Sequence, residues 1–436
     1  MPDKFHPGAG RDWGVALTDP VRDDWVRRGG APDLDRIRQL FPPTTGDAAF
    51  DPTVIASNIE RLVTTPKVDT GHPFLDLSVK TGLAFIDATF QGDHPKYGIK
   101  GYGEACADGF PPTIIAAVDA LSGWGLTPRA TRLFRYYLVN FVRDDGTLNY
   151  RGTSLAELGQ LLHTGALLME RAGMEGWWAD GFPHLERIAE RLLAMRRQAE
   201  QEDGLLAGVP EDDERKKVGK YFHNNAWVSR GLARWAVACG RTSASPATPS
   251  SVTEAAARAL AKDTLSAIRR AWPEDPADWW LPPQVEPLAR PSCLTGTREA
   301  SYTNYRYWPE LLASGLLSRD MAERVVNARL TAGGQFCGMT RFEGWLDDWP
   351  LADYLDGLWQ LGREGDFLLS LYGHVACHQA GGHLTAYEQV SLPPMKEVAP
   401  YCLPCQLVAA RMAGRLRERR AETGNARTGL NWYKEE

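Results

Sequence analysis

The sequence predicts an all-α protein whose antiparallel helical hairpins close into a ring, an (α/α)6 toroid. Apolar residues recur three and four positions apart in about a dozen segments, the spacing of one helix face. Extended runs of alternating β-branched residues are nearly absent, which disfavours a parallel sheet. The chain has 436 residues, more than one ordinary core supports, and a ring of hairpins accommodates that length because each hairpin packs mainly on its neighbours.

The helical pattern starts near residue 53. Residues 1–50 are rich in Pro, Gly, Asp and Arg, so we expect an irregular N-terminal arm there and one helical domain over 51–436. Gly and Pro separate the periodic segments, and Gly181-Phe182-Pro183 is predicted to be such a connection. The segments are Val54–Leu62, Leu75–Ile86, Ile114–Leu121, Ala130–Phe141, Leu155–Met169, Leu185–Met195, Ala226–Ala238, Ala255–Ile268, Leu311–Leu316, Ala322–Leu330, Leu351–Leu361, Phe367–Val375 and Leu407–Leu416.

Two other architectures remain open. One is an open α-solenoid, which has a similar helix content, and the other is a pair of separate domains with a boundary in the low-complexity residues 241–252. The closed ring is favoured because the hairpins share no repeated consensus. Several of its connections are also long and rich in Trp, Asp, Glu and Gly, as expected for a face that carries a site.

Charge and composition exclude several function classes. The net charge is −6, which argues against nucleic acid as a partner because phosphate binding needs a basic face. No apolar run approaches the roughly 20 residues that cross a bilayer, and the N-terminus has no signal-peptide pattern. Seven scattered cysteines are typical of reduced thiols, so we expect a cytoplasmic protein. The oligomeric state stays open, a homodimer included.

The chain is rich in tryptophan, with 15 Trp beside 14 Tyr and 14 Phe. Many of these Trp residues, among them Trp178 and Trp345, lie next to Gly, Pro or Asp. Such side chains either pack at helix ends or offer flat apolar faces to sugar rings.

An acidic loop is the first candidate for chemistry. After Gly208-Val209-Pro210 the chain presents four successive carboxylates, including Glu211, Asp213 and Glu214, and the following helix begins with His223 and Trp227. Clustered carboxylates raise the pKa of at least one member, as a general acid requires near neutral pH. The alternative is a solvated loop neutralised by the three basic residues after it.

A late carboxylate, Glu388, is the second candidate. It lies between Tyr387 and Gln389, has no neighbouring Lys or Arg, and follows His383. Such a residue suits a general base, and the alternative is a Glu that caps a loop or helix.

Two further segments combine aromatic and polar residues. Residues 342–350 contain Trp345 and two Asp residues that either cap the next helix or contact a ligand. Residues 298–308 contain Tyr302 and Arg306 in a strip suited to ligand binding or to packing.

We expect no metal and no cofactor. His374 and His378 have the i, i+4 spacing of zinc ligands, but the Glu of the zincin motif is absent. Cys402 and Cys405 form a CxxC pair without a second pair or a βαβ context.

Together these segments resemble the six-hairpin glycosidase superfamily over residues 70–420. The resemblance lies in Asp203-Gly204-Leu205 with the acidic loop, the helix from Asn225, the strip from Ser301 to Tyr305, and the stretch that ends at Glu388. Asp213-Glu214-Arg215 resembles the Asp-Glu-Arg loop of α-L-rhamnosidase-like domains, and Tyr387-Glu388 resembles their late Glu after an aromatic residue. This chain departs from them after Arg215, where it has Lys216-Lys217, and it lacks their accessory β-domains.

The resemblance implies a glycoside hydrolase that acts on a carbohydrate with inversion. Glu214, or else Asp213 or Glu211, would then be the acid and Glu388 the base. Two alternatives stay open: a lyase that acts on a uronate-containing sugar, and a scaffold that binds carbohydrate without cleaving it. The candidates for the lyase are the cluster of His223, Asn224 and Asn225, and the pair of Tyr302 and Arg306. The substrate-binding residues implied are Trp178, His223, Trp227, Tyr302, Trp345 and His383.

Overall fold

The computed structural model describes residues 68–98, 108–150, 154–173, 176–211, 215–241, 246–272, 275, 278–379, 384–390 and 402–423. The N-terminal arm predicted for residues 1–50 and the helix predicted over Val54–Leu62 lie outside this part of the chain.

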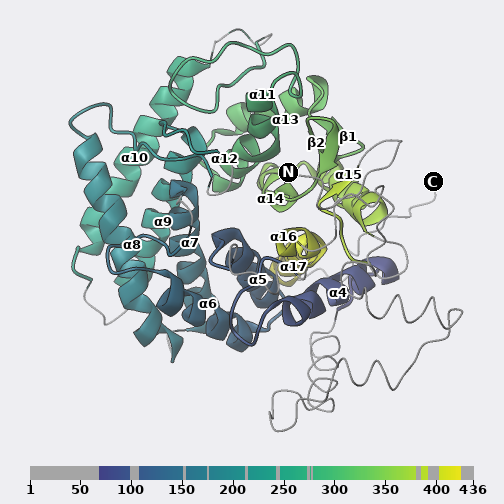
Figure 1. Cartoon of the computed structure of the whole chain (residues 1–436), viewed down its shortest axis with the longest axis horizontal. Coiled ribbons are helices and arrows are strands. Elements are labelled where there is room, and N and C mark those ends of the chain that lie inside the picture. The colour runs from purple at the N-terminus through teal and green to yellow at the C-terminus, as the bar shows by residue number, and fades with distance from the viewer. Residues whose placement is uncertain are drawn as a thin grey trace, which may run out of the picture.

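The inner layer of the fold is a closed ring of helices (Figure 1). Each of these helices contacts the next, and the last contacts the first, so the ring has no open edge. This closure confirms the predicted toroid and excludes an open solenoid. The inner helices are α5 (Pro111–Gly123), α7 (Leu155–Ala172), α9 (Phe222–Gly240), α12 (Trp308–Ser314), α14 (Leu351–Leu361) and α17 (Val408–Thr423).

A second layer of helices packs around the ring. Outer and inner helices alternate along the chain, so all inner helices run in the same direction. We call the end of the ring where the inner helices begin the loop end, and the opposite end the far end. The outer helices are α4 (Pro73–Thr89), α6 (Thr127–Phe141), α8 (Trp177–Ala199), α10 (Ser250–Ala271), α13 (Arg319–Thr331) and α15 (Glu364–Gly373).

Two glycines bring the inner helices α7 and α9 into backbone contact. A Cβ atom on Gly159 would overlap the backbone of Trp227, and a Cβ atom on Gly231 would overlap the backbone of Gly159. Only glycine therefore permits this spacing, which fixes the side chains of both helices that point toward the ring axis.

The connection predicted at Gly181-Phe182-Pro183 is wrong, because α8 continues through it. Pro183 lies in the second turn of the helix, where its fixed φ is compatible with helix and only one hydrogen bond is lost. The burial of Trp177, Trp178 and Leu185 by the same helix offsets that loss.

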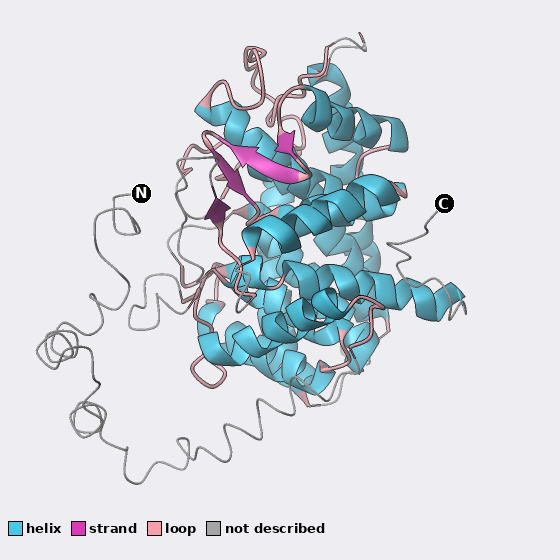
Figure 2. Ribbon diagram, turned by 90° about the vertical axis from the view of Figure 1, so that its right-hand side faces the viewer, coloured by secondary structure: helices cyan, strands magenta, loops and turns pink. Residues whose placement is uncertain are grey.

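Short strands form a small antiparallel sheet at the loop end (Figure 2). The strands are β1 (Gln335–Phe336), β2 (Met339–Phe342) and β3 (Trp345–Asp347), all before α14, and β4 (Gln389–Val390), which follows α15. In the pairing of β3 with β4, Asp347 lies opposite Gln389. Periodicity did not predict these strands because each has only two to four residues.

Four short helical segments complete the loop end. They are α11 (Arg298–Tyr302) and the π-helical η4 (Thr303–Tyr307) before α12, then the π-helical η5 (His374–His378) after α15, and α16 (Leu403–Gln406) before α17. None of the described helices is both long and apolar enough to cross a membrane.

Candidate functional site

The described parts of the segments that carry the candidate carboxylates and Tyr302 lie at the loop end. Glu211 precedes α9, Tyr302 precedes α12, Asp347 precedes α14 and Glu388 precedes α17, so each lies before an inner helix. Contacts join these segments. Arg215 forms an ion pair with Glu299, and its guanidinium lies 4.9 Å from the ring centroid of Tyr302.

Aromatic side chains from several of these segments pack together. The ring centroids of Phe110 and Trp349 are 5.8 Å apart, and those of Tyr305 and Phe342 are 4.5 Å apart. We call this group the aromatic cluster. Its buried aromatic members are Phe110, Tyr221, Tyr302, Tyr305, Tyr307 and Trp349, with Tyr97, Tyr150 and Phe342 packed against them.

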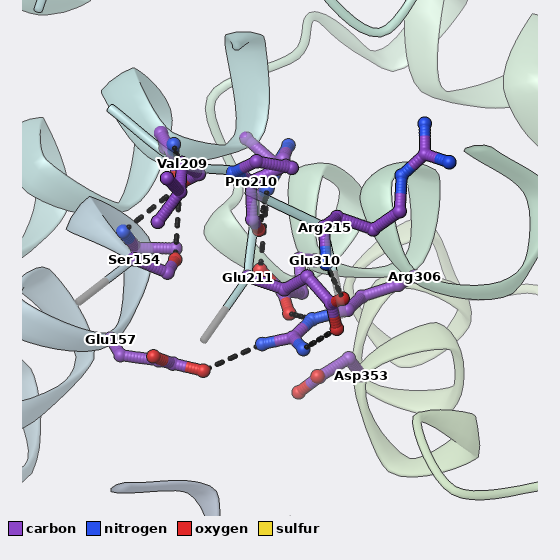
Figure 3. Close-up of polar contacts among 12 residues, drawn as sticks. Ser154, Glu157, Val209, Pro210, Glu211, Arg215, Arg306, Glu310 and Asp353 are labelled. Atoms are coloured by element: carbon purple, nitrogen blue, oxygen red, sulfur yellow. Dashed lines mark hydrogen bonds and ion pairs between the residues drawn. The ribbon is translucent and has the colours of Figure 1, made fainter. Parts of the chain in front are cut away.

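Next to the aromatic cluster, Arg306 bonds three carboxyl groups at once (Figure 3). Its guanidinium donates to Glu157 at 2.6 Å, to Glu211 at 2.9 Å and to Glu310 at 2.6 Å. All four side chains are buried, and Arg306 lies 5.1 Å from the ring centroid of Trp349. This Arg306 cluster joins α7, the acidic loop and α12, and it contains more carboxyl groups than cations.

The excess of carboxyl groups leaves a proton in the Arg306 cluster. Burial raises the pKa of Glu310 to about 8, against the opposing charge of Arg306, so Glu310 is mainly protonated at neutral pH. Burial also raises the pKa of the neighbouring Asp353 to about 6.

His223 lies beside the Arg306 cluster as a neutral side chain. Burial lowers its pKa to about 3, its Nε2 donates to the carbonyl oxygen of Pro210 at 2.9 Å, and its ring stacks on Tyr307 at 4.8 Å. It is fully buried, and it connects the acidic loop to the aromatic cluster.

Both oxygens of Glu211 accept hydrogen bonds. Oε1 accepts from the backbone N–H of Arg215 at 2.6 Å, and Oε2 accepts from Arg306 at 2.9 Å. Glu211 and Arg215 thus hold both flanks of the acidic loop at this end of the ring. Asp213 and Glu214 themselves, like His383, lie outside the described residues.

Apart from the Arg306 cluster, the loop end carries a pair of neighbouring carboxyl groups, Asp347 and Glu388. Asp347 accepts from the side chain of Gln389 at 2.6 Å and from the backbone N–H of Trp349 at 3.0 Å. Burial first, and then the charge of Glu388, raise the pKa of Asp347 well above its usual range. Asp347 is fully buried and Glu388 is half-buried, so the two neighbouring carboxyl groups lie in different surroundings.

Two histidines anchor the segment that carries Glu388. Oδ2 of Asp348 lies 3.3 Å from Nδ1 of His374 and 3.3 Å from Nε2 of His378. Nδ1 of His378 lies 3.0 Å from the carbonyl oxygen of Tyr387. The backbone N–H of Tyr387 in turn donates to the carbonyl oxygen of His378 at 2.7 Å. Within the described ranges no group of three or more His, Cys, Asp or Glu side chains has the arrangement of a metal site.

The predicted aromatic contacts are divided between different places. Tyr302 belongs to the aromatic cluster, and Trp345 is half-buried on β3. Trp227 faces the ring axis from α9. Trp178 is packed in the core between Phe182 and Trp235 and does not reach the loop end, because outer helix α8 begins at the far end.

The sequence analysis did not single out Glu157, Glu310 or Asp353. Each occupies a buried or inward position of an amphipathic helix, where a charged residue breaks the apolar pattern. That break was the available signal, because a charge at such a position needs a partner.

No protein-family model matches the chain, and no curated protein matches it. Solved structures do. A metal-independent α-mannosidase from Streptococcus pneumoniae has a TM-score of 0.59 at 11% identity over 83% of this chain and 98% of its own. A wild-type glycosidase has a TM-score of 0.55 at 14% identity, over 79% of this chain and 97% of its own. A rhamnosidase from Klebsiella oxytoca with rhamnose bound has a TM-score of 0.55 at 12% identity, over 81% of this chain and 65% of its own. The chain therefore shares its fold with these glycosidases, and this fold is the helical toroid that the sequence predicted.

Proposed function

We propose that the protein is a glycoside hydrolase whose active site lies at the loop end. The observation that carries this proposal is the meeting of two carboxyl-bearing segments, one with Asp347 and Glu388 and one with Glu211, around the aromatic cluster. Proteins of the same fold include a glycosidase in complex with glucose and the rhamnosidase with rhamnose bound. Aromatic faces beside paired carboxyl groups suit the binding and cleavage of a sugar.

Glu388 is the proposed general base. It would accept a proton from a water molecule as the water oxygen attacks the anomeric carbon. A carboxylic acid on the opposite side would donate its proton to the leaving oxygen as the glycosidic bond breaks. We propose inversion, for which the two carboxyl groups stand about 6.5–9.5 Å apart.

The acid is proposed to be Glu214 or Asp213 rather than Glu211. Glu211 accepts two hydrogen bonds, one of them from the Arg306 guanidinium, and this geometry suits a carboxylate that positions the loop. Asp213 and Glu214 lie shortly after Glu211 in the same acidic loop. Tyr302, Trp345 and His383 remain the proposed contacts to the sugar.

Arg306 is not proposed as the cation of a lyase. Its guanidinium already bonds three carboxyl groups of the protein, so it is not available to neutralise a uronate carboxylate.

The test is the activity of Glu388→Gln on a panel of aryl glycosides and oligosaccharides. We expect kcat to fall by about 10²–10⁴-fold with the fold unchanged. Glu364→Gln, an exposed substitution in the first turn of α15, should keep full activity. Proton NMR of the first product formed should show the inverted anomer. Full activity of Glu388→Gln on a true substrate would overturn the assignment.

A further inference from the structure

A cavity lies on the axis of the ring. It has a volume of about 340 Å³ and is lined by inner helices on all sides. Toward the loop end the cavity is bordered by Glu310 and Trp349, which belong to or contact the Arg306 cluster. Toward the far end it is bordered by Arg234 and Gln360, which lie in the C-terminal halves of their helices. Gln360 is exposed, so the cavity meets solvent at the far end.

One wall of this cavity is cationic. α7 contributes His163 and Arg171, and α9 contributes Trp227, Arg230 and Arg234, at helical spacings that place each set on one face. The glycine contact between α7 and α9 joins the two faces into a single surface, which we call the cationic wall.

Charge on the opposite wall is compensated, and on the cationic wall Arg234 pairs with Glu170, whereas Arg230 pairs with no carboxylate of the described residues. Arg411 and Arg415 both bond Asp119 at 2.9 Å, and Arg415 also bonds Asp356 at 3.0 Å. In the described part of the chain Arg230 has no ion pair, and it donates to the carbonyl oxygen of Ala313 at 2.6 Å. Burial, then the charges of Arg230 and Arg234, lower the pKa of His163 well below its usual range, which agrees with a positive potential there.

Polar atoms on the cationic wall lack acceptors. Trp227 is 7% exposed, and its Nε1 has no hydrogen-bond partner among the described residues. Within the same ranges Nε of Arg234 also has none. A buried donor without an acceptor is unfavourable, so two such N–H groups around one cavity indicate a ligand that supplies oxygen acceptors.

We infer that the axial cavity binds a small hydroxylated anion, with a carboxylate or phosphate group against Arg230 and Arg234. Arginine is suited to both groups because its planar donors pair with two oxygens. The sugar-like part of the ligand lies between Trp227 and Trp359, and its hydroxyl groups meet the unpaired donors. The volume falls within the roughly 300–1,000 Å³ of small-molecule pockets. Trp349 of the aromatic cluster borders this cavity, and the inference does not depend on the proposed hydrolase activity.

Calorimetric titration of the full chain tests the inference, with gluconate, glucose 6-phosphate and inorganic phosphate as probes and glucose as the uncharged control. We expect one anion bound per chain, weakened by added salt, and no comparable binding of glucose. The preference among the three probes identifies the acidic group. Arg230→Gln should weaken binding by about tenfold or more. Arg258→Gln, an exposed substitution on α10, should leave it unchanged.

Two further variants separate the cavity from the loop end. Leu167→Trp narrows the cavity without removing a charge and should abolish binding. Arg234→Gln, at the half-buried mouth, provides the charge test if Arg230→Gln does not fold. Glu388→Gln should bind the anion as the parent does. The inference is overturned if no probe binds below about 10 mM, if binding survives Leu167→Trp, or if Glu388→Gln loses it.

Discussion

The protonated Glu310 predicts an unusual pH dependence of stability, which Glu310→Gln should remove. In the folded protein burial raises the pKa of this carboxyl group from 4.5 to about 8. Between those values the folded state keeps a proton that the unfolded state has released. The free energy of unfolding contributed by Glu310 is therefore fully present below about pH 4.5 and is lost as the pH rises toward 8.

The size of this effect follows from the linkage relation. Each pH unit in the window changes the free energy of unfolding by about 1.4 kcal/mol. Between about pH 5.5 and 7.5 the contribution of Glu310 thus falls by roughly 2–3 kcal/mol. Glutamine has the shape of the protonated acid and keeps an oxygen to accept from Arg306 at the position of the 2.6 Å bond, but it does not titrate. Relative to the parent, the variant should gain roughly 2–3 kcal/mol across this window.

Urea unfolding at several pH values measures this difference, provided that the slope with urea is unchanged. The control is Glu323→Gln on α13, which removes a half-buried carboxylate paired with Arg363 at the surface. Its profile should run parallel to that of the parent. If the profile of Glu310→Gln also runs parallel, Glu310 is ionised in the folded protein and the proton in the Arg306 cluster does not exist.

Three other predictions concern the same framework. Arg306→Gln leaves three buried carboxyl groups without their cation and should cost about 3–5 kcal/mol at neutral pH, with partial recovery in acid seen by circular dichroism. Gly159→Ala forces a Cβ atom into the backbone of α9 and should lower stability by about 1–3 kcal/mol in thermal unfolding, a loss that a wider helix spacing would prevent. If Glu214 is the acid, Glu214→Gln should lose activity on glycosides with poor leaving groups and keep it on dinitrophenyl glycosides. A variant at Glu211 should lose activity on both kinds of glycoside to the same extent. If instead the Glu211 variant alone keeps activity on dinitrophenyl glycosides, Glu211 is the acid and Glu214 positions the loop.

The helices were predictable because each has a clear apolar face. The predicted bounds of Leu351–Leu361 agree with those of α14, and α4, α5, α6, α7 and α13 extend the predicted segments by less than one turn at each end. The strands and α11 were missed because two to five residues show no clear period, and η4 was missed because all of its residues are buried.

The site was predictable only in outline. An alternating chain of hairpins places the residues before every second helix at one end, so Tyr302 and Glu388 were expected to lie there together. The partners of Arg306 were not predictable, because Glu157 and Glu211 lie 149 and 95 positions away along the chain. Only the closed ring determines which distant helices face each other.

Closure of the ring has a consequence for synthesis of the chain. The indole N–H of Trp124 bonds the carbonyl oxygen of Ala410 at 2.8 Å, and Asp119 bonds Arg411, so early and late helices depend on each other. A nascent chain that ends before residue 402 would leave the apolar sides of α4 and α5 without their partner, and such surfaces promote association between unfinished chains. The ring is therefore expected to fold to completion only after α17 leaves the ribosome, and chaperones that shield apolar surface would act on the stages before that.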